Sequence, residues 1–267
     1  MARPLLLPGA VTGIGSLPHR DVEHAIAFAL AATPALPAVP SLPQRDPREG
    51  MIAQALAGHD GFRDVAAFLV ARGDGPVKVQ LTGPVTLAVA LGDTSRARTI
   101  VRGNTRSLQA VLAGRPVVCF LDEPSFAGLE PSEAGALVGD ALAAVAEFAT
   151  TGVHCCGRTD WQTIVAAGPD VLSIPVELAA AVPQRVLDQH VDAGGWVAWG
   201  AVPTDRVVAA GDLELLWRAL ADQLARDDRL ASRSLVTPAC GLATHTIEQA
   251  ETVYALARAL GERIAAK

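Results

Sequence analysis

Two stretches of the chain carry residue types that bind transition metals. His154 and Cys156 lie two residues apart near the middle of the sequence, and Cys240 lies near its C-terminal end. Residues two apart on an extended strand point to the same face, so His154 and Cys156 can project together while Cys155 points the other way. One histidine and two cysteines suit zinc, which takes nitrogen and sulfur ligands in a tetrahedral arrangement. These three side chains are therefore a candidate zinc site.

The cysteines also allow plainer roles. The chain has four of them, Cys119, Cys155, Cys156 and Cys240, which are too few for a disulfide framework in 267 residues. Two of them are adjacent, which argues against simple pairing, and a cytoplasmic setting would keep all four reduced. A core histidine beside buried thiols is the plainer interpretation of the His-x-Cys pair taken alone. The third ligand, followed by Gly241 that permits a tight turn, favours metal binding.

The elements that must position these residues recur regularly. Short apolar runs rich in valine and bounded by glycine or proline alternate with longer Ala/Leu stretches of helical period. Strands are predicted at residues 11–15, 38–41, 77–81, 116–121, 152–156, 171–174, 196–200 and 235–238. Helices are predicted at residues 21–32, 61–72, 132–149, 160–167, 205–226 and 246–265. Eight strand–helix units predict one (β/α)8 TIM barrel of the α/β class over residues 1–267.

An open doubly wound sheet is the alternative fold, but residues 13–18 lack the third glycine of a dinucleotide-binding turn. Several predicted helices begin with a capping residue. Asp21, Asp160 and Asp205 can accept hydrogen bonds from first-turn amides, and Thr246 with Gln249 has capping-box spacing.

Polar side chains follow several predicted strands, where a barrel gathers its chemistry. They are Ser16 and His19 after the first strand, Thr82 after the third, Asp122 and Glu123 after the fourth, Glu177 after the sixth and Asp205 after the seventh. We expect them to converge with the metal ligands on one rim. A turn hydroxyl is the plainer interpretation of Ser16, and a solvated turn is that of Asp122 and Glu123.

Five sequence strings resemble the catalytic domain of cobalamin-independent methionine synthase, in the same order and over nearly the whole chain. They are TGIGSLP (residues 12–18), LTGPVT (81–86), LDEP (121–124), HCC (154–156) and TPACGL (237–242). That domain belongs to a superfamily of (β/α)8 barrels that includes uroporphyrinogen decarboxylase and corrinoid-dependent methyltransferases. The resemblance therefore implies the same fold as the strand count, and a methyltransferase that converts homocysteine to methionine.

The resemblance also implies a zinc ion held by the three side chains named above and by a glutamate after the next strand. In the family this glutamate directly follows the strand, where the chain has Pro175. Glu177, two residues further on, is the candidate fourth ligand. A water molecule or Cys155 is the alternative.

A homocysteine pocket follows from the same resemblance. The backbone around Ile14 and the hydroxyl of Ser16 would hold the substrate carboxylate. Asp122, with Glu123, would pair with the substrate ammonium. Asp122 and His19 are therefore the predicted catalytic residues, His19 as a relay for the thiol proton.

The expected mechanism rests on thiol chemistry. A free thiol has a pKa of about 8.5, and zinc coordination would convert it to a thiolate that attacks the donor methyl group. Asp205 is the alternative to the histidine as proton relay.

Two departures from the family concern the methyl donor. The full-length family enzyme has an additional N-terminal barrel that helps to hold a polyglutamylated folate, and we expect a single barrel here. The family's folate-stacking tryptophan is replaced by apolar residues such as Val89 and Leu91. The expected donor is therefore methylcobalamin, free or carried on a corrinoid protein. Trp196 and Trp199 are predicted core residues.

Composition excludes several classes of partner. The net charge is −6, and lysine and arginine form no blocks, so a nucleic-acid-binding surface is not expected. Neither a targeting peptide nor a membrane span is expected, because proline or charge interrupts every apolar stretch. The prediction is a cytoplasmic protein.

Two other functions fit the same sequence. One is a barrel enzyme of the same superfamily that acts on another thiol or as a decarboxylase. A porphyrinogen decarboxylase is expected to carry an arginine-rich substrate-binding loop near its N-terminus. Here only Arg20 lies near the first predicted strand, and Arg45 and Arg48 follow the second. The other is a non-catalytic barrel that binds zinc or a small ligand, which the proline at the expected glutamate position favours.

Overall fold

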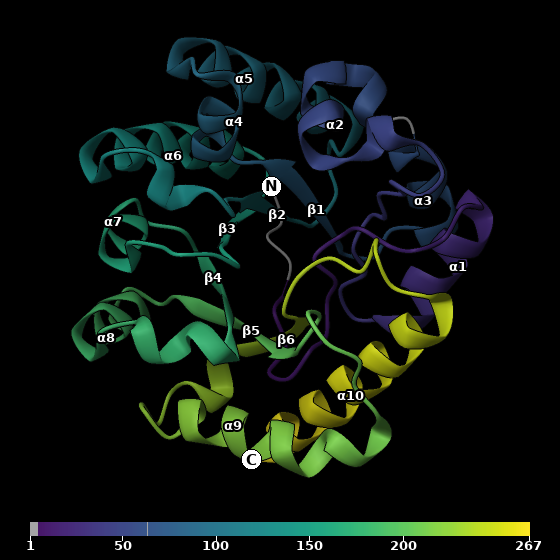
Figure 1. Ribbon diagram of the computed structural model, residues 1–267, viewed down its shortest axis with the longest axis vertical. Coiled ribbons are helices and arrows are strands. Elements are labelled where there is room, and N and C mark those ends of the chain that lie inside the picture. Colours follow the sequence, from purple (N-terminus) through teal and green to yellow (C-terminus); the bar gives the residue numbers. More distant parts are fainter. Residues whose placement is uncertain (1–4, 63) are drawn as a thin grey trace.

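The computed structural model describes residues 5–62 and 64–267, which form an α/β fold around one parallel sheet. Each strand pairs with the next one along the chain, and helices cover the outer side of the curved sheet, which forms a half-barrel (Figure 1). The strands are β1 (Val77–Thr82), β2 (Val117–Asp122), β3 (Thr150–His154), β4 (Val171–Pro175), β5 (Trp196–Val202) and β6 (Ser234–Pro238). Six of the eight predicted strands are thus confirmed.

The two predicted N-terminal strands are not formed as strands. Residues 11–15 and 38–41 are extended segments that make isolated parallel bridges, at Val11 with Val236, Ser16 with Ser41 and Ala38 with Lys78. Pro37 and Pro40 explain the second segment, because proline has no N–H to donate to a ladder. In the first segment Gly15 has φ +143°, which interrupts regular strand geometry. The prediction of eight full strands was wrong at these two places.

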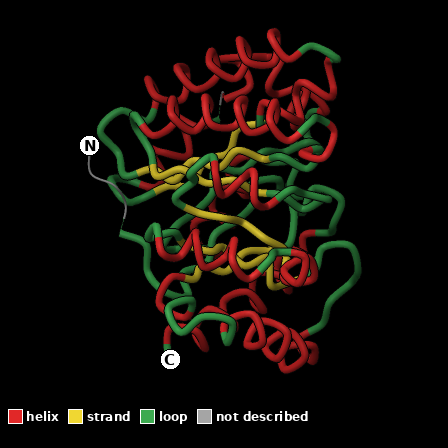
Figure 2. The backbone as a smooth tube through the Cα atoms, turned by 90° about the vertical axis from the view of Figure 1, so that its left-hand side faces the viewer, coloured by secondary structure: helices red, strands yellow, loops and turns green. Residues whose placement is uncertain are grey.

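Ten α-helices lie among the described residues, and they flank the strands in the side view (Figure 2). They are α1 (Val22–Ala32), α2 (Met51–Ala57), α3 (Val65–Arg72), α4 (Pro84–Leu91), α5 (Thr94–Val111), α6 (Pro131–Ala146), α7 (Trp161–Ala166), α8 (Gln184–Asp192), α9 (Leu213–Leu224) and α10 (Ile247–Ala265). Short 3-10 helices are η1 (Pro47–Glu49), η2 (Gly58–Phe62), η3 (Phe126–Gly128), η4 (Val176–Ala181), η5 (Ala210–Asp212) and η6 (Ala231–Arg233). Among the described residues, no helix combines the length and the apolar character that crossing a membrane requires.

Three of the four predicted helix caps are confirmed. The Asp21 carboxylate accepts from the His24 amide at 2.8 Å, and that of Asp160 accepts from the Gln162 amide at 3.1 Å. Thr246 and Gln249 form the reciprocal capping box of α10. The cap at Asp205 was wrong, because α9 begins eight residues later, after the glycine-containing η5.

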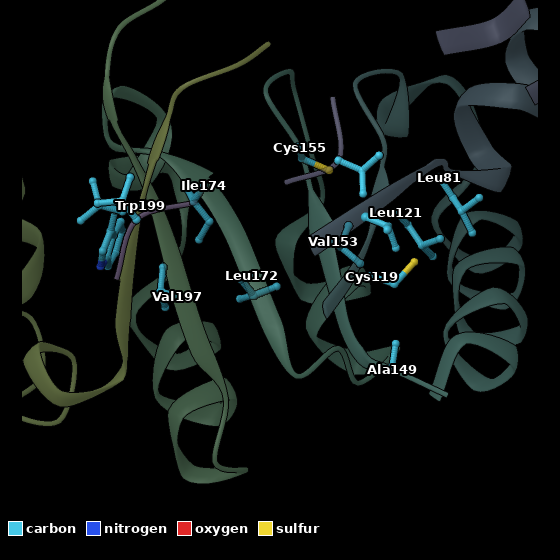
Figure 3. Close-up of a cluster of buried hydrophobic side chains, with 14 of the residues drawn as sticks. Leu81, Cys119, Leu121, Ala149, Val153, Cys155, Leu172, Ile174, Val197 and Trp199 are labelled. Carbon is cyan, nitrogen blue, oxygen red and sulfur yellow. The ribbon is translucent and has the colours of Figure 1, made fainter. Parts of the chain in front are cut away.

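Side chains of the strands alternate between two apolar clusters. Those that point to the helices, including Leu81, Leu121, Ile174 and Trp199, belong to the large core between sheet and helices (Figure 3). The alternate residues form a smaller cluster inside the half-barrel: Val118, Phe120, Val171, Ala198 and Leu235, with Leu36. This alternation places the last inward residue of each strand at the end where the chain leaves for the next helix.

Candidate functional site

The three predicted metal ligands meet at the carboxyl ends of β3 and β6. His154 ends β3, Cys156 follows two residues later, and Cys240 lies two residues beyond β6. Their ligand atoms lie within 4.8 Å of one another, and the Sγ atoms of Cys156 and Cys240 are 3.6 Å apart. Two sulfurs bound at about 2.3 Å to one tetrahedral zinc lie roughly 3.8 Å apart. The sulfur spacing therefore fits a shared metal ion.

The orientation of the His154 ring leaves one nitrogen for a metal. The ring is buried, and its Nδ1 lies 2.9 Å from the Ser173 Oγ on the neighbouring strand β4. Its Nε2 is buried and has no hydrogen-bond partner within the described residues. Metal-binding histidines use such a second bond to hold the ring and its tautomer. Ser173 was not predicted, although its inward position beside His154 in the strand register is the signal that would have identified it.

The pKa values of the two cysteines shift in opposite directions. Their mutual hydrogen bond, followed by the influence of the neighbouring His154 ring, lowers the pKa of Cys240 to about 4. The same bond, together with burial, raises the pKa of Cys156. The pair therefore offers one thiolate at neutral pH, which is the form that binds a metal.

A cavity of about 340 Å³ opens beside the three ligands. Its lining includes Ile14, Ser16 and Asp122, all of which were predicted to bind substrate. Small-molecule pockets span roughly 300–1,000 Å³, so this volume suits a compact ligand.

Asp122 is a buried residue of the cavity lining. It ends β2 and pairs in register with His154 of β3. Burial raises the pKa of Asp122, whereas the charge of Lys78 acts to lower it. Its Oδ1 is buried without a hydrogen-bond partner among the described residues. A buried and unpaired carboxylate oxygen is costly unless a ligand satisfies it, so this atom can accept from a cationic group.

A close backbone approach brings the turn of residues 14–16 to the metal ligands. The Ser16 carbonyl accepts from the Leu242 amide at 2.9 Å. A Cβ at Gly241 would lie 2.0 Å from the Ser16 Oγ, so only glycine lets this hydroxyl pack against the residue after Cys240.

Glu123 is a correction to the predicted substrate pocket. It does not line the cavity, and its carboxylate accepts from the amides of Val85 at 2.9 Å and Thr86 at 2.7 Å. These amides belong to the first turn of α4, so Glu123 satisfies a buried helix N-terminus. The alternation of strand side chains explains the difference, since Asp122 points inward and its neighbour points away.

Replacing Glu123 with alanine is expected to lower the free energy of unfolding by about 2–4 kcal/mol, because two buried amides lose their acceptor. The Glu123→Gln variant keeps one acceptor oxygen, so it should lower the free energy of unfolding by less.

Burial raises the pKa of Glu123 from 4.5 to about 7, so this carboxyl binds its proton more tightly in the folded state. Its contribution to stability is present below pH 4.5 and is lost as the pH rises through about 7. Urea denaturation across this range should show a weaker pH dependence in Glu123→Gln, and equal profiles would contradict the assignment.

The candidate fourth ligand, Glu177, is also placed elsewhere. Pro175 ends β4 and the chain continues into η4, which carries the Glu177 side chain outward. That side chain is 52% exposed and pairs with Arg206 at 2.7 Å. The alternative ligand, Cys155, is buried in the helix-facing core (Figure 3), where its thiol donates to the Glu123 carbonyl at 3.3 Å. The described residues thus bring three protein ligands together, the number that catalytic zinc sites use with an open fourth position.

The two predicted proton relays do not line the cavity beside the metal ligands. His19 is buried against Phe28, with ring centroids 5.0 Å apart, and burial lowers its pKa. It lines a separate cavity with His245. The Asp205 side chain is 74% exposed beside Arg206. Neither residue is placed to take a proton from a thiol at the metal ligands.

Comparison with known proteins supports the fold. No protein-family model matches the chain, and no curated protein matches it. Among solved structures it is similar to a B12-independent methionine synthase from Shewanella sp. W3-18-1, determined in complex with selenomethionine, with a TM-score of 0.55 and 19% identity. That alignment covers 76% of this chain and 66% of the other, so the chain spans just under two thirds of that neighbour. An intracellular xylanase from Thermoanaerobacterium saccharolyticum gives a TM-score of 0.50 at 11% identity, covering 88% and 86% of the two chains. At these identities the likeness shows a fold shared by enzymes of different chemistry.

Proposed function

We propose that the protein is a zinc-dependent S-methyltransferase that converts homocysteine to methionine. The observation that carries the proposal is the cluster of His154, Cys156 and Cys240 beside a cavity whose lining includes Asp122, with its unpaired Oδ1. We interpret the fold as a (β/α)8 barrel in which bridged segments replace the first two strands. The similarity to a methionine synthase structure is consistent with this proposal.

The residues of the cluster fit zinc by type, spacing and burial. His154 offers its unpartnered Nε2, held by Ser173, and the two thiols lie at the spacing that one metal ion requires. A zinc ion held there supplies the positive charge that keeps an incoming thiol deprotonated and nucleophilic at neutral pH.

The cavity would orient the rest of the substrate. Asp122 accepts the ammonium group, which satisfies its unpaired oxygen, while the turn around Ile14 and the Ser16 hydroxyl take the carboxylate. Asp122 pairs in register with His154, and Ser16 packs against Gly241, the residue after Cys240. The short side chain of homocysteine would therefore reach the cluster while its ammonium and carboxylate groups are bound. The homocysteine thiol would thereby point at the three ligands.

The methyl donor is proposed to be methylcobalamin, free or on a corrinoid protein. A cavity of about 340 Å³ is at the lower end of small-molecule pockets, so a corrin ring would present its methyl group from the opening. A donor delivered by a partner protein fits this arrangement.

The test is methionine formation by the zinc-loaded protein from homocysteine, measured by mass spectrometry with methylcobalamin and methyltetrahydrofolate in parallel reactions. We expect methionine in the reaction with methylcobalamin and not in the reaction with methyltetrahydrofolate. The Cys240→Ala variant should form no methionine with either donor. Methylation of a different thiol would retain the proposed metal chemistry and overturn the acceptor. Stoichiometric zinc without transfer to any thiol would favour a binding protein.

A further inference from the structure

Lys78 is fully buried inside the half-barrel. It lies on β1 with its side chain pointing inward, and its Nζ donates to the Ile14 carbonyl at 2.5 Å and approaches the Gln80 Oε1 at 3.3 Å. Its ammonium also lies 4.7 Å from the centroid of the Phe120 ring. Within the described part of the chain, no carboxylate is in ion-pair contact with it, and Asp122 acts on it through its charge alone. An ammonium buried without an ion pair is costly, which suggests a role beyond packing.

The cavity beside the metal ligands lacks a cationic side chain. Its described lining contains the acidic residues Asp122 and Glu49, and neither lysine nor arginine. Arg45 pairs with Glu49, so the Asp122 carboxylate is the acidic group of the described lining without an ion pair. A substrate carboxylate would therefore meet neutral donors and no charged one from the side chains of this lining. Lys78 is a buried cation whose charge acts on Asp122.

We propose that Lys78 is a positioning residue that makes the turn of residues 14–16 a carboxylate-binding site. This inference rests on the proposed function, because it concerns the carboxylate of the amino-acid substrate. The Ile14 carbonyl and the Gly15 N–H belong to one peptide unit. A charged donor on the carbonyl polarises that unit and strengthens the N–H as a donor toward an anion on the other side.

The geometry of the turn supports this role. Gly15 has φ +143°, and a Cβ there would lie 2.1 Å from the Gln80 Nε2, so the turn packs directly on β1. Gln80 in turn donates to the Val39 carbonyl at 3.0 Å. Lys78 and Gln80 thus hold the two bridged segments by side-chain bonds where regular strand pairing is missing. Burial lowers the pKa of Lys78 to about 8, which leaves it mainly protonated at neutral pH.

The experiment compares three ligands in the zinc-loaded wild type and in Lys78→Met, by isothermal titration calorimetry at pH 7. The ligands are methionine, its decarboxylated form 3-(methylthio)propylamine, and its deaminated form 4-(methylthio)butanoate. We expect Lys78→Met to weaken both carboxylate-bearing ligands by roughly ten-fold, the effect of one charge at a distance of a peptide unit. Binding of the amine should change less than about two-fold.

Three outcomes would overturn the inference: an equal loss for all three ligands, a loss confined to the two amine-bearing ligands, or no loss. The second would show that Lys78 acts through Asp122. Lys78→Gln is the second variant, in case methionine at this position prevents folding, because it keeps a donor for the Ile14 carbonyl without the charge. It should also weaken the carboxylate-bearing ligands, and wild-type affinity would overturn the charge argument. Wild-type protein that binds neither methionine nor homocysteine would instead contradict the proposed function.

Discussion

Replacing Cys240 with alanine is expected to reduce bound zinc from near one per chain to a small fraction, with an affinity loss of more than about 100-fold. The physical reason is the loss of one of three protein ligands, a larger change than the 10–100-fold typical of residues that only support a ligand. The hydrogen bond from Cys156 also lowers the pKa of Cys240, so this thiol gives up its proton more readily than that of Cys156. Elemental analysis after refilling under reducing conditions, with a chelator competition, measures both quantities.

Glu177→Ala is the matched control for this prediction. Its carboxylate is exposed and pairs with Arg206, so zinc content should equal that of the wild type. Loss of zinc in this control would mean that the loop after β4 rearranges to bring the glutamate to the metal. A wild-type protein that takes up no zinc would contradict the metal site itself.

Replacing Asp122 with asparagine is expected to weaken methionine binding by roughly 10–100-fold, with zinc content unchanged. A hydrogen bond to a charged group contributes about 1.5–3 kcal/mol, and the variant removes the charge while it keeps the shape of the side chain. The buried, unpaired Oδ1 is the atom that the substrate ammonium would satisfy. Calorimetric titration of the zinc-loaded variant measures the change.

The deaminated ligand 4-(methylthio)butanoate provides the internal control, because it has no ammonium to lose and should bind Asp122→Asn at least as well as the wild type. Asp140→Asn is the matched surface control, since Asp140 pairs with Arg98 at 3.5 Å on exposed helices. Unchanged methionine affinity in Asp122→Asn would remove this residue from the ammonium site.

Much of the fold could be predicted from local pattern. Apolar runs bounded by glycine and proline located β1 to β6, and side-chain oxygens before helical stretches located the starts of α1, α7 and α10. The same reasoning was wrong for residues 11–15 and 38–41, where extended segments form single bridges. Extended conformation is a local property, whereas a ladder needs N–H donors at the right register, and prolines remove some of them.

The candidate site was predicted unevenly. The His-x-Cys spacing correctly placed both ligands on one side of the chain, and the glycine after Cys240 permits the close turn that brings it to them. The same alternation, applied to Asp122 and Glu123, would have separated the inward residue from the one that caps α4. That error came from treating two adjacent acids as one group.

By itself the sequence determined the types of the candidate metal ligands, the strands that carry them and the face on which each lies, because these depend on residue chemistry and on the two-residue period of a strand. Only the tertiary structure decided which distant groups meet. In the tertiary structure Cys240 lies beside His154 and Cys156, and Glu177 points outward. His19 packs against Phe28, and Lys78 donates to the Ile14 carbonyl. The physical reason is that the path of a loop and the partner of a buried charge depend on long-range packing, which no local spacing encodes.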